Sequence, residues 1–420
     1  MAFWRRFLQR DEDESLAACT ALDVGTEWAK ALVFEIDDTG RGVVRGVGRQ
    51  QQGLAHMQSG TVADIAAVVD NCAMALQAAE EMAGFRPTQV VIGIAGELVK
   101  GFTTSHSMER KRPDAPITEA ELQRLINEVQ REALREAERA ITWETGLPNV
   151  DVRLVHAAVT GSTIDGYPVT NPVGFQGRHV RISIFNAFAP LVHLGALQSV
   201  AGQLDLDLLA VVAEPYAVAR CLGGEQVQQS GALFIDVGGG TTDVALVRQG
   251  GIEGTRMFAL GGRAFTKSLA DRLDLPFPRA EQVKIDHARG LPVDEPEQVE
   301  RIIGEDVQVW AAGVELILEE LAGGDLLPGR IYLCGGGSRL PHLLTALSDG
   351  RFAKRLPFAR PPEVTIIEPA QVEAIRDATK LLVDQQDVTP LGLAYQAIEM
   401  ATEEAPLDVA LKRVLRAMKV

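Results

Sequence analysis

The chain has 420 residues, of which 46% are hydrophobic and 23% charged, a composition typical of globular proteins with two or three domains. Its formal net charge of −16 argues against a nucleic-acid-binding protein, because an acidic surface repels phosphate. The four cysteines form no CxxC pair, the seven histidines show no ligand spacing typical of a metal site, and no apolar run is long enough to cross a membrane. We therefore expect neither a disulfide scaffold nor an integral membrane protein, and the cysteine pattern favours a reducing cytoplasm.

The first folded part of the chain is predicted to be a β-meander followed by a helix. Runs of apolar residues bounded by turn residues predict strands at Ala18–Val24, Ala29–Ile36 and Gly42–Gly48. Apolar residues then recur at helical spacing over Thr61–Ala83. The first residue of this helix can serve as its N-cap, and Gly84 stands where a helix-terminating glycine is common.

A compact α+β insertion is predicted next. The helix expected over Ile117–Ala140 begins with a capping box, in which Thr118 and Glu121 satisfy each other's backbone N–H groups. Strands are expected at Leu154–Ala158 and Val180–Phe185, on either side of a turn-rich stretch.

The second half of the chain repeats the pattern of the first. Gly231–Val237 is an all-apolar strand of the kind found in sheets covered on both faces, and Arg330–Cys334 is another strand that opens into a glycine run. A strand, a glycine-threonine turn and a returning strand occur at Asp23 and again at Asp236. We therefore predict two similar halves that face one another with a ligand between them.

Two loops carry the chemistry of this arrangement. In Asp23-Val-Gly-Thr26 and in Asp236-Val-Gly-Gly-Gly-Thr-Thr-Asp243, an aspartate ends a buried strand and glycines follow. Glycine lets backbone N–H groups approach an anion, threonine adds a hydroxyl, and an aspartate can hold the waters around Mg²⁺. A motif like the first loop, taken alone, is often only a turn. The pair of loops is typical of a site that binds a triphosphate from two sides.

These loops resemble the two phosphate motifs of the superfamily of actin, the DnaK-type chaperones and the sugar kinases. Cys334-Gly-Gly-Gly-Ser-Arg-Leu-Pro341 is similar to its adenosine motif, Glu281 and Lys284 match the helix beside the adenosine, and Ala213-Glu-Pro-Tyr-Ala217 matches its connecting segment. The resemblance implies an α/β protein with the actin-like ATPase fold, whose two similar lobes enclose a nucleotide cleft. It also implies ATP and Mg²⁺ as cofactors and is compatible with a slow Mg²⁺-dependent ATPase.

The resemblance assigns roles to single residues. Asp23 and Asp236 would organise Mg²⁺, Lys30 would neutralise the β- and γ-phosphates, and Glu214 would position or deprotonate the attacking water. The alternatives are that Lys30 is a solvated strand lysine and that Glu214 is a charge stabilised at a helix N-terminus. The nucleotide-binding set implied is Gly25, Thr26, Lys30, Gly238, Gly239, Gly240, Thr241, Thr242, Glu281, Lys284, Gly335, Gly336, Gly337, Ser338 and Arg339.

The segment Ile164–Gly177 indicates the branch of the superfamily. It resembles the insertion that replaces actin's usual side domain in FtsA-type proteins and in PilM, and its Asn-Pro-Val-Gly form is closer to FtsA. Gly261-Gly262 and Thr389–Ala394 also resemble FtsA. The stretch between Gly290 and Leu326 is shorter than in FtsA-type proteins, which dock the tail of the tubulin-like FtsZ there. This shortening puts an FtsZ-like partner in doubt and is more like PilM.

The resemblance implies a division of the chain into eight parts. They are an amphipathic N-terminal segment 1–17, first-lobe core 18–87, an inserted α+β (SHS2-like) subdomain 88–187, first-lobe core with the connecting segment 188–222, second-lobe core 223–262, a shortened helical subdomain 263–327, second-lobe core 328–398, and a linker with a C-terminal amphipathic helix 399–420.

Both chain ends are basic and amphipathic. On a helix, residues 407–420 would present leucines and valines on one face and Lys412, Arg413, Arg416 and Lys419 on the rest, as in the membrane anchors with which FtsA-type proteins end. The alternative is a terminal helix packed on its own domain. Residues 1–10 carry aromatic side chains beside arginines, like the N-terminal helices of MreB-type proteins.

Three functions are compatible with these features. The first is an ATP-binding, self-associating cell-division protein that tethers an FtsZ-like filament to the cytoplasmic face of the bacterial inner membrane, as a peripheral protein that binds anionic lipid. The second is a PilM-like module that holds a membrane-protein peptide in a pilus or secretion assembly. The third, a small-molecule kinase, is disfavoured by the FtsA-like insertion and the amphipathic ends.

Overall fold

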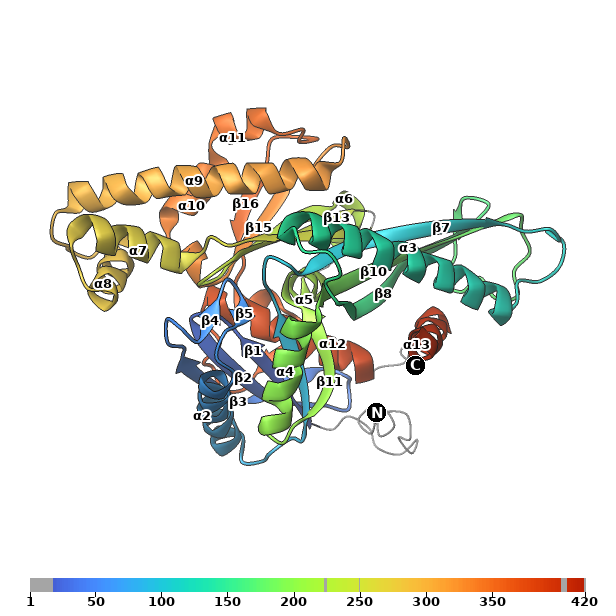
Figure 1. Cartoon of the computed structure of the whole chain (residues 1–420), viewed down its shortest axis with the longest axis horizontal. Coiled ribbons are helices and arrows are strands. Elements are labelled where there is room, and N and C mark those ends of the chain that lie inside the picture. The colour runs from blue at the N-terminus through green and yellow to red at the C-terminus, as the bar shows by residue number, and fades with distance from the viewer. Residues whose placement is uncertain (1–17, 223–224, 249, 402–405, 419–420) are drawn as a thin grey trace.

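The computed structural model describes residues 18–222, 225–248, 250–401 and 406–418 of the chain (Figure 1). The N-terminal segment 1–17, for which an amphipathic helix is predicted, lies outside these residues. Within them, no helix is long and apolar enough to cross a membrane.

The first lobe is built on a six-stranded sheet with helices on both faces. Its strand order is β11-β6-β1-β2-β3-β17. One face packs against α2 and α4, and the other against α5 and α12, so that the side chains of each strand enter two apolar cores in alternation. The bounds are β1 Ala18–Val24, β2 Trp28–Ile36, β3 Gly42–Gln51, β6 Gln89–Ile94, β11 Asp207–Ala213, β17 Ile375–Asp377, α2 Ile65–Ala83, α4 Leu191–Gln203, α5 Glu214–Cys221 and α12 Val388–Ala401.

The second lobe contributes five strands, in the order β16-β15-β12-β13-β14, to a larger sheet. Its outer face packs against α7, α8, α9 and α10 around the buried Trp310, and the opposite face shares a core with α5 and α12. The bounds are β12 Ala232–Val237, β13 Thr242–Arg248, β14 Gly251–Phe258, β15 Arg330–Cys334, β16 Glu363–Ile366, α6 Glu225–Ser230, α7 Gly262–Leu273, α8 Phe277–Ala288, α9 Pro296–Ala322, α10 Pro341–Ser348 and α11 Gly350–Arg355.

The two lobes have the same strand topology. In β11-β6-β1-β2-β3 the first two contacts are parallel and the next two antiparallel, and the same sequence of contacts occurs in β16-β15-β12-β13-β14. The internal repeat predicted from the two aspartate loops is therefore present in the structure. It brings the carboxyl ends of β1 and β12 to the space between the lobes.

The remaining strands of the larger sheet belong to an α+β projection, seen at the right of Figure 1. Its order β7-β10-β8-β9 continues from β14 of the second lobe, and α3 covers one face. The capping box predicted at Thr118 and Glu121 is confirmed at the start of α3. The bounds are β7 Lys100–Glu109, β8 Val152–Ile164, β9 Tyr167–Pro168, β10 His179–Pro190 and α3 Glu119–Thr145.

Helix α2 begins later than the sequence pattern indicates. Its N-cap is Asp64, whose side chain accepts a hydrogen bond from the Ala67 N–H, so the prediction of Thr61 as the cap is wrong. Residues Thr61–Val62 instead form β5, which pairs with β4 (Met57–Gln58). The predicted terminating residue Gly84 is confirmed, with φ of 79°. The remaining short elements are the 3-10 turns η1 Gly336–Arg339, η2 Pro369–Gln371 and η3 Gln385–Asp387.

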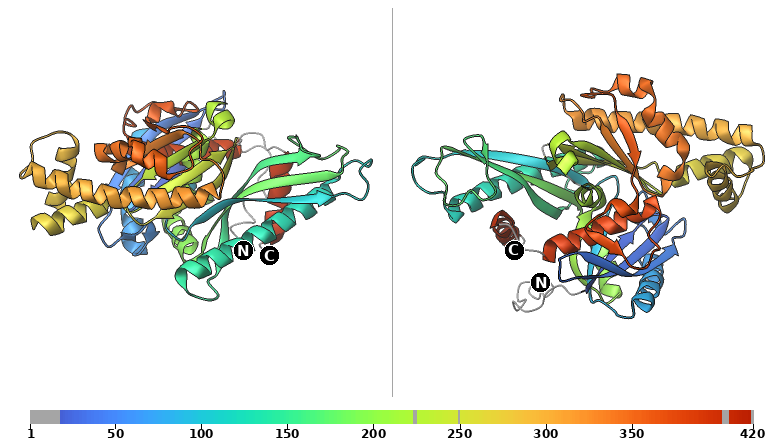
Figure 2. Two further views of the ribbon diagram at one scale, coloured as in Figure 1. Left: turned by 90° about the horizontal axis from the view of Figure 1, so that it is seen from above. Right: turned by 180° about the vertical axis from the view of Figure 1, so that it is seen from behind.

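The C-terminal helix α13 (Pro406–Met418) packs against the α+β projection (Figure 2). Leu407, Ala410, Leu411 and Val414 are buried in one core with residues of α3, β8 and β10. The apolar face for which a membrane contact is predicted is thus covered by the protein, as in the alternative of a helix packed on its own domain. The linker residues 402–405 lie outside the described part of the chain.

Candidate functional site

A cavity of about 710 Å³ lies between the two lobes. Its size is within the range usual for small-molecule and cofactor sites. It is lined by the β1–β2 turn, the start of α5, the β12–β13 loop, α7, α8, and the turn after β15. The ends of the topologically equivalent strands β1 and β12 therefore meet at one space.

The two glycine loops lie in contact across this cavity. A Cβ atom added to Gly240 would stand 2.7 Å from Thr26 Oγ1, and one added to Gly239 would stand 2.8 Å from Glu27 Cβ. Only glycine permits this approach without displacing the opposite loop. Arg263 of α7 adds an ion pair between the lobes, donating from Nε to Glu27 Oε2 at 2.6 Å.

Lys30 is held within the cavity wall. Its Nζ donates to Asp23 Oδ2 at 2.9 Å and to the Gln386 carbonyl oxygen at 2.9 Å. Burial opposes the lysine's charge, but the carboxylates of Asp23, Asp236 and Asp387 more than offset it and raise the pKa of Lys30. The side chain is only 12% exposed, so it is not a solvated strand lysine.

Glu214 is the first residue of α5 and lines the cavity. The absence of a side chain at Gly93 makes room for it, since an added Cβ there would lie 2.6 Å from Glu214 Oε1. Burial, together with the negative charge of Asp23, Asp243 and Asp236, raises the pKa of Glu214 well above its usual value. Glu214 is therefore a helix N-terminal carboxyl that also faces the cavity, and its role toward an attacking water stays a prediction.

Two further carboxyl groups come from the second lobe. Burial is the main cause that raises the pKa of Asp236 and, together with the Asp236 charge, raises the pKa of Asp243 well above its usual value. Asp236 accepts a hydrogen bond from the Thr389 hydroxyl. Asp243 Oδ2 accepts one from Thr241 at 3.2 Å, while Oδ1 is buried without a hydrogen-bond partner among the described residues.

These groups fit a magnesium ion. Mg²⁺ takes oxygen ligands and usually keeps several waters, so it needs few protein carboxylates. One buried carboxylate oxygen of Asp243 has no hydrogen-bond partner among the described residues, and burial, followed by the charge of Asp236, raises the pKa of this group. A bound cation would stabilise the charged form of such a carboxyl. Asp23 and Asp236, the residues predicted for this role, line the same cavity.

Helix α8 and the turn after β15 also line the cavity. Lys284 Nζ donates to Glu281 Oε2 and to Thr266 Oγ1, both at 2.8 Å, so the two residues predicted beside the adenosine are paired with one another. The turn after β15 needs a glycine at Gly335, which has φ of 83° and packs on Asp236. The predicted residues Gly336, Gly337, Ser338 and Arg339 follow it along the cavity wall.

Two of the predicted residues do not line the cavity. Gly240 contacts Thr26 of the opposite loop instead. The Thr242 hydroxyl donates to the Leu260 carbonyl oxygen at 2.7 Å and accepts from Trp310 Nε1 at 2.9 Å, which leaves it a structural role. The other predicted residues (Asp23, Gly25, Thr26, Lys30, Glu214, Asp236, Gly238, Gly239, Thr241, Glu281, Lys284, Gly335, Gly336, Gly337, Ser338, Arg339) surround one space.

Other residues of the wall were missed by sequence reasoning. Asp243 ends the second glycine loop and could have been singled out as its second aspartate; it stands directly opposite Asp236 in the β12–β13 pairing. The ion pair between Glu27 and Arg263 joins residues far apart in the chain and carries no local signal.

Comparison with known proteins finds similarity to the cell division protein FtsA. A family model described as cell division protein FtsA matches residues 233–380. Cell division protein FtsA of Pseudomonas aeruginosa is 27% identical over 272 residues, which cover 64% of this chain and 61% of that protein. For FtsA of Streptococcus pneumoniae the values are 24% over 376 residues, with 85% and 78% covered. The match to FtsA of Neisseria meningitidis, at 29% identity, covers 60% of that protein. The chain thus matches about three fifths of the length of the Pseudomonas and Neisseria proteins.

Among solved structures, the PilM-PilN type IV pilus biogenesis complex has a TM-score of 0.62 at 18% identity, over 90% of this chain and 98% of the matched chain. This likeness confirms the actin-like α/β fold. The sequence matches confirm the predicted resemblance to FtsA-type bacterial actin homologues.

Proposed function

We propose that this FtsA-like protein binds Mg-ATP between its lobes and acts in cell division as a self-associating tether at the cytoplasmic face of the inner membrane. The observation that carries this proposal is the pair of glycine loops, each following an equivalent strand, that meet across one cavity. Lys30 lines this cavity, and so do Asp23, Glu214, Asp236 and Asp243. Such a cavity suits a triphosphate with its cation.

The residues of the cavity suit distinct parts of the nucleotide. The backbone N–H groups of the two glycine loops and Lys30 would hold the phosphates, and α8 with the turn after β15 would hold the base. Asp23, Asp236 and Asp243 would hold Mg²⁺ through its waters. When bound, the ion supplies neutralisation of phosphate charge, which phosphoryl transfer needs more than covalent chemistry.

Glu214 would govern the rate of hydrolysis. In that reaction the water oxygen bonds to the γ-phosphorus, the bond to the β–γ bridging oxygen breaks, and Glu214 takes the proton of the water. Burial, with the negative charge of Asp23, Asp243 and Asp236, raises the pKa of Glu214, which makes this carboxyl a stronger base than an exposed one.

The membrane contact would require α13 to leave the α+β projection. Its apolar face is buried there, and the same face cannot cover α3 and enter lipid at once. Docking and lipid binding would therefore compete. A filament would favour lipid, because many weak anchors on one polymer act together. The partner implied by the resemblance to FtsA is an FtsZ-like filament.

A PilM-like peptide-binding module is the second candidate. The fit to the PilM-PilN complex covers almost all of the matched chain. The fully described segment 263–327 also consists of α7, α8 and α9 without a strand, consistent with the shortening predicted there. In this reading the α+β projection would hold a peptide of a membrane protein.

Binding and sedimentation experiments test the two readings. We expect the full chain to bind Mg-ATP saturably by calorimetry and to co-sediment with anionic vesicles more strongly in its presence. Pull-downs with an FtsZ tail peptide and with an N-terminal peptide of a pilus membrane protein would follow. No ATP binding would overturn the proposed cleft. Binding to the second peptide only, without vesicle binding, would replace the tether with the PilM-like module.

A further inference from the structure

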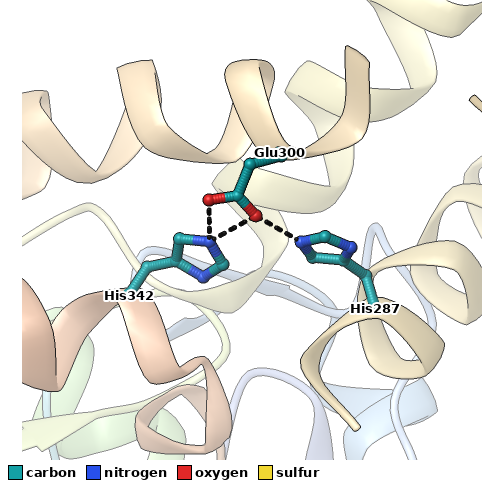
Figure 3. Close-up of side chains that lie close together, drawn as sticks. All are labelled: His287, Glu300 and His342. Carbon is teal, nitrogen blue, oxygen red and sulfur yellow. Dashed lines mark hydrogen bonds and ion pairs between the residues drawn. The ribbon is translucent and has the colours of Figure 1, made fainter. Parts of the chain in front are cut away.

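Three side chains from three different helices converge outside the nucleotide cavity. His287 lies in the last turn of α8, Glu300 near the start of α9, and His342 in the first turn of α10 (Figure 3). His287 Nε2 lies 2.9 Å from Glu300 Oε2, and His342 Nε2 lies 3.0 Å from each Glu300 oxygen. The three ligand atoms all lie within 4.8 Å of one another.

The orientation and the exposure of the three side chains suit metal binding. The imidazole rings are nearly parallel, with an angle of 23° and centroids 5.6 Å apart, and Figure 3 shows both pointing at the carboxylate. The histidine side chains are 16% and 20% exposed, so each ring is held by its surroundings. Glu300 is 58% exposed, which leaves solvent access for a metal and for water as a fourth ligand.

We propose that His287, Glu300 and His342 form a binding site for a borderline divalent metal ion of the Zn²⁺ type. Two imidazoles and one carboxylate, with an open fourth position, are a common zinc ligand set. Neighbouring ligand atoms of tetrahedral zinc stand roughly 3.3 Å apart at bond lengths of about 2.0–2.2 Å. Small rotations of the side chains reach that spacing from the present one. Imidazole ligands select against Mg²⁺ and Ca²⁺, which prefer oxygen.

The site is separate from the proposed magnesium position but touches the same walls. Ala288 and Arg289, which follow His287, line the nucleotide cavity, and so does Pro341, which precedes His342. A metal bound to these ligands would join α8, α9 and α10 on the side of the cavity assigned to the base. This inference concerns the metal site alone and does not depend on the proposed function.

Metal titration of the full chain tests the inference. After removal of metals by a chelator, Zn²⁺ is titrated by competition with a chromophoric chelator in buffer containing excess Mg²⁺. We expect one tight equivalent. Each of His287→Ala, His342→Ala and Glu300→Gln should weaken Zn²⁺ binding by about 100-fold. Losing a residue that only hydrogen-bonds to a metal ligand already weakens metal binding by up to about 100-fold, so losing a ligand itself should cost at least as much.

The matched control is His106→Ala. His106 also pairs with a glutamate, Glu132, at 3.4 Å, but no third ligand is near it among the described residues. This variant should bind Zn²⁺ like the unmodified chain. Circular dichroism establishes that each variant is folded. Equal Zn²⁺ binding by the His287→Ala/His342→Ala double variant, or no saturable binding by the unmodified chain, would show that the cluster is only a hydrogen-bonded contact between helices.

A second measurement needs no variant. Co²⁺ in a tetrahedral site with nitrogen and oxygen ligands gives visible absorption bands, and Zn²⁺ added to the Co²⁺-loaded chain should remove them. Bands of the weak octahedral type, as for Co²⁺ in water, would overturn the assignment.

Discussion

Lys30 and Asp243 occupy equivalent positions in the two lobes. Lys30 stands opposite Asp23 in the β1–β2 ladder, and Asp243 stands opposite Asp236 in the β12–β13 ladder. The repeat therefore places a cation beside the aspartate of one lobe and a second carboxyl beside the aspartate of the other. At this paired position the two lobes therefore differ in charge, with a lysine facing one aspartate and a carboxyl facing the other, and all four side chains line the cavity.

Replacing Lys30 by methionine should weaken both the fold and nucleotide binding. The change removes the partner of Asp23, which is only 4% exposed, and a buried carboxylate left unpaired costs about 3 kcal/mol. Chemical denaturation measures the stability, and calorimetry the Mg-ATP affinity, which should fall about tenfold or more because a phosphate partner is lost. Lys354→Met, on an exposed part of α11, is the control and should change neither. An unchanged affinity would remove Lys30 from the phosphate site.

Replacing Glu214 by glutamine should stabilise the nucleotide-free protein and slow hydrolysis. Folding raises the pKa of this carboxyl. The protein therefore loses stability as the pH rises from the carboxyl's pKa in the unfolded state through its higher pKa in the folded state, because the folded state resists losing the proton. The gain in stability of the variant should therefore be small near pH 4 and should grow as the pH rises above that value.

Turnover of Mg-ATP by Glu214→Gln should fall by a factor of about 100, in the usual range for loss of a general base. Phosphate release under steady-state conditions measures it. A variant that hydrolyses ATP at the original rate would assign the proton to another group.

Replacing Trp310 by phenylalanine should destabilise the second lobe. The buried indole N–H donates to Thr242, whose own hydroxyl donates to Leu260, so one change breaks a hydrogen-bond chain beneath the phosphate loop. We expect a loss of about 2 kcal/mol, from the lost hydrogen bond and the space left behind. Trp143→Phe is a matched control, because Trp143 is 87% exposed. Similar thermal stability of both variants would contradict the role assigned to Thr242.

Loosening the core that holds α13 should increase vesicle binding. Leu125→Ala removes a buried side chain of α3 from that core and leaves the apolar face of α13 intact, whereas Leu411→Glu undocks α13 and also spoils its lipid face. Hydrogen exchange of residues 406–418 should accelerate in both variants, but co-sedimentation with anionic vesicles should rise only in the first. Leu316→Ala, at a position 68% exposed on α9, should alter neither. Faster exchange in Leu125→Ala without added vesicle binding would disconnect docking from lipid.

Zinc and nucleotide should change each other's affinity by the same factor. The proposed metal ligands adjoin Ala288 and Pro341 of the nucleotide cavity, so fixing them fixes part of that wall. A coupling of about fivefold is the lower end of typical values. Calorimetric titration of ATP with and without one equivalent of Zn²⁺ measures one arm, and the reverse titration measures the other. Identical ATP affinities would show that the wall is already rigid.

The parts of the fold that local sequence determines were predictable. The bounds of β1 and β15 agree with the predicted strands, and the capping box of α3 involves only residues three positions apart. The two glycine loops that line the cavity were predictable for the same reason, since each is one continuous stretch. Thr61 was mistaken for a cap because a short strand pairing, which needs a partner elsewhere, takes precedence over capping there.

The features that depend on tertiary contacts were not predictable. The amphipathic pattern of α13 is the same whether its apolar face meets lipid or α3, so sequence alone leaves the choice open. The histidine cluster escaped notice because His287 and Glu300 are 13 positions apart and His342 a further 42, a spacing that no motif describes. Only the packing of three helices brings these side chains together.

The pairing of β14 with β7 gives the α+β projection two attachments. Both of its chain connections lead to strands of the first lobe, β6 and β11, whereas Gly254 and Thr255 of the second lobe hydrogen-bond to it along Phe102 and Gly101. A rotation of one lobe against the other would therefore bend or shear this junction. Because the projection extends away from it, such a rotation would displace the far end of the projection more than the strands beside the cleft.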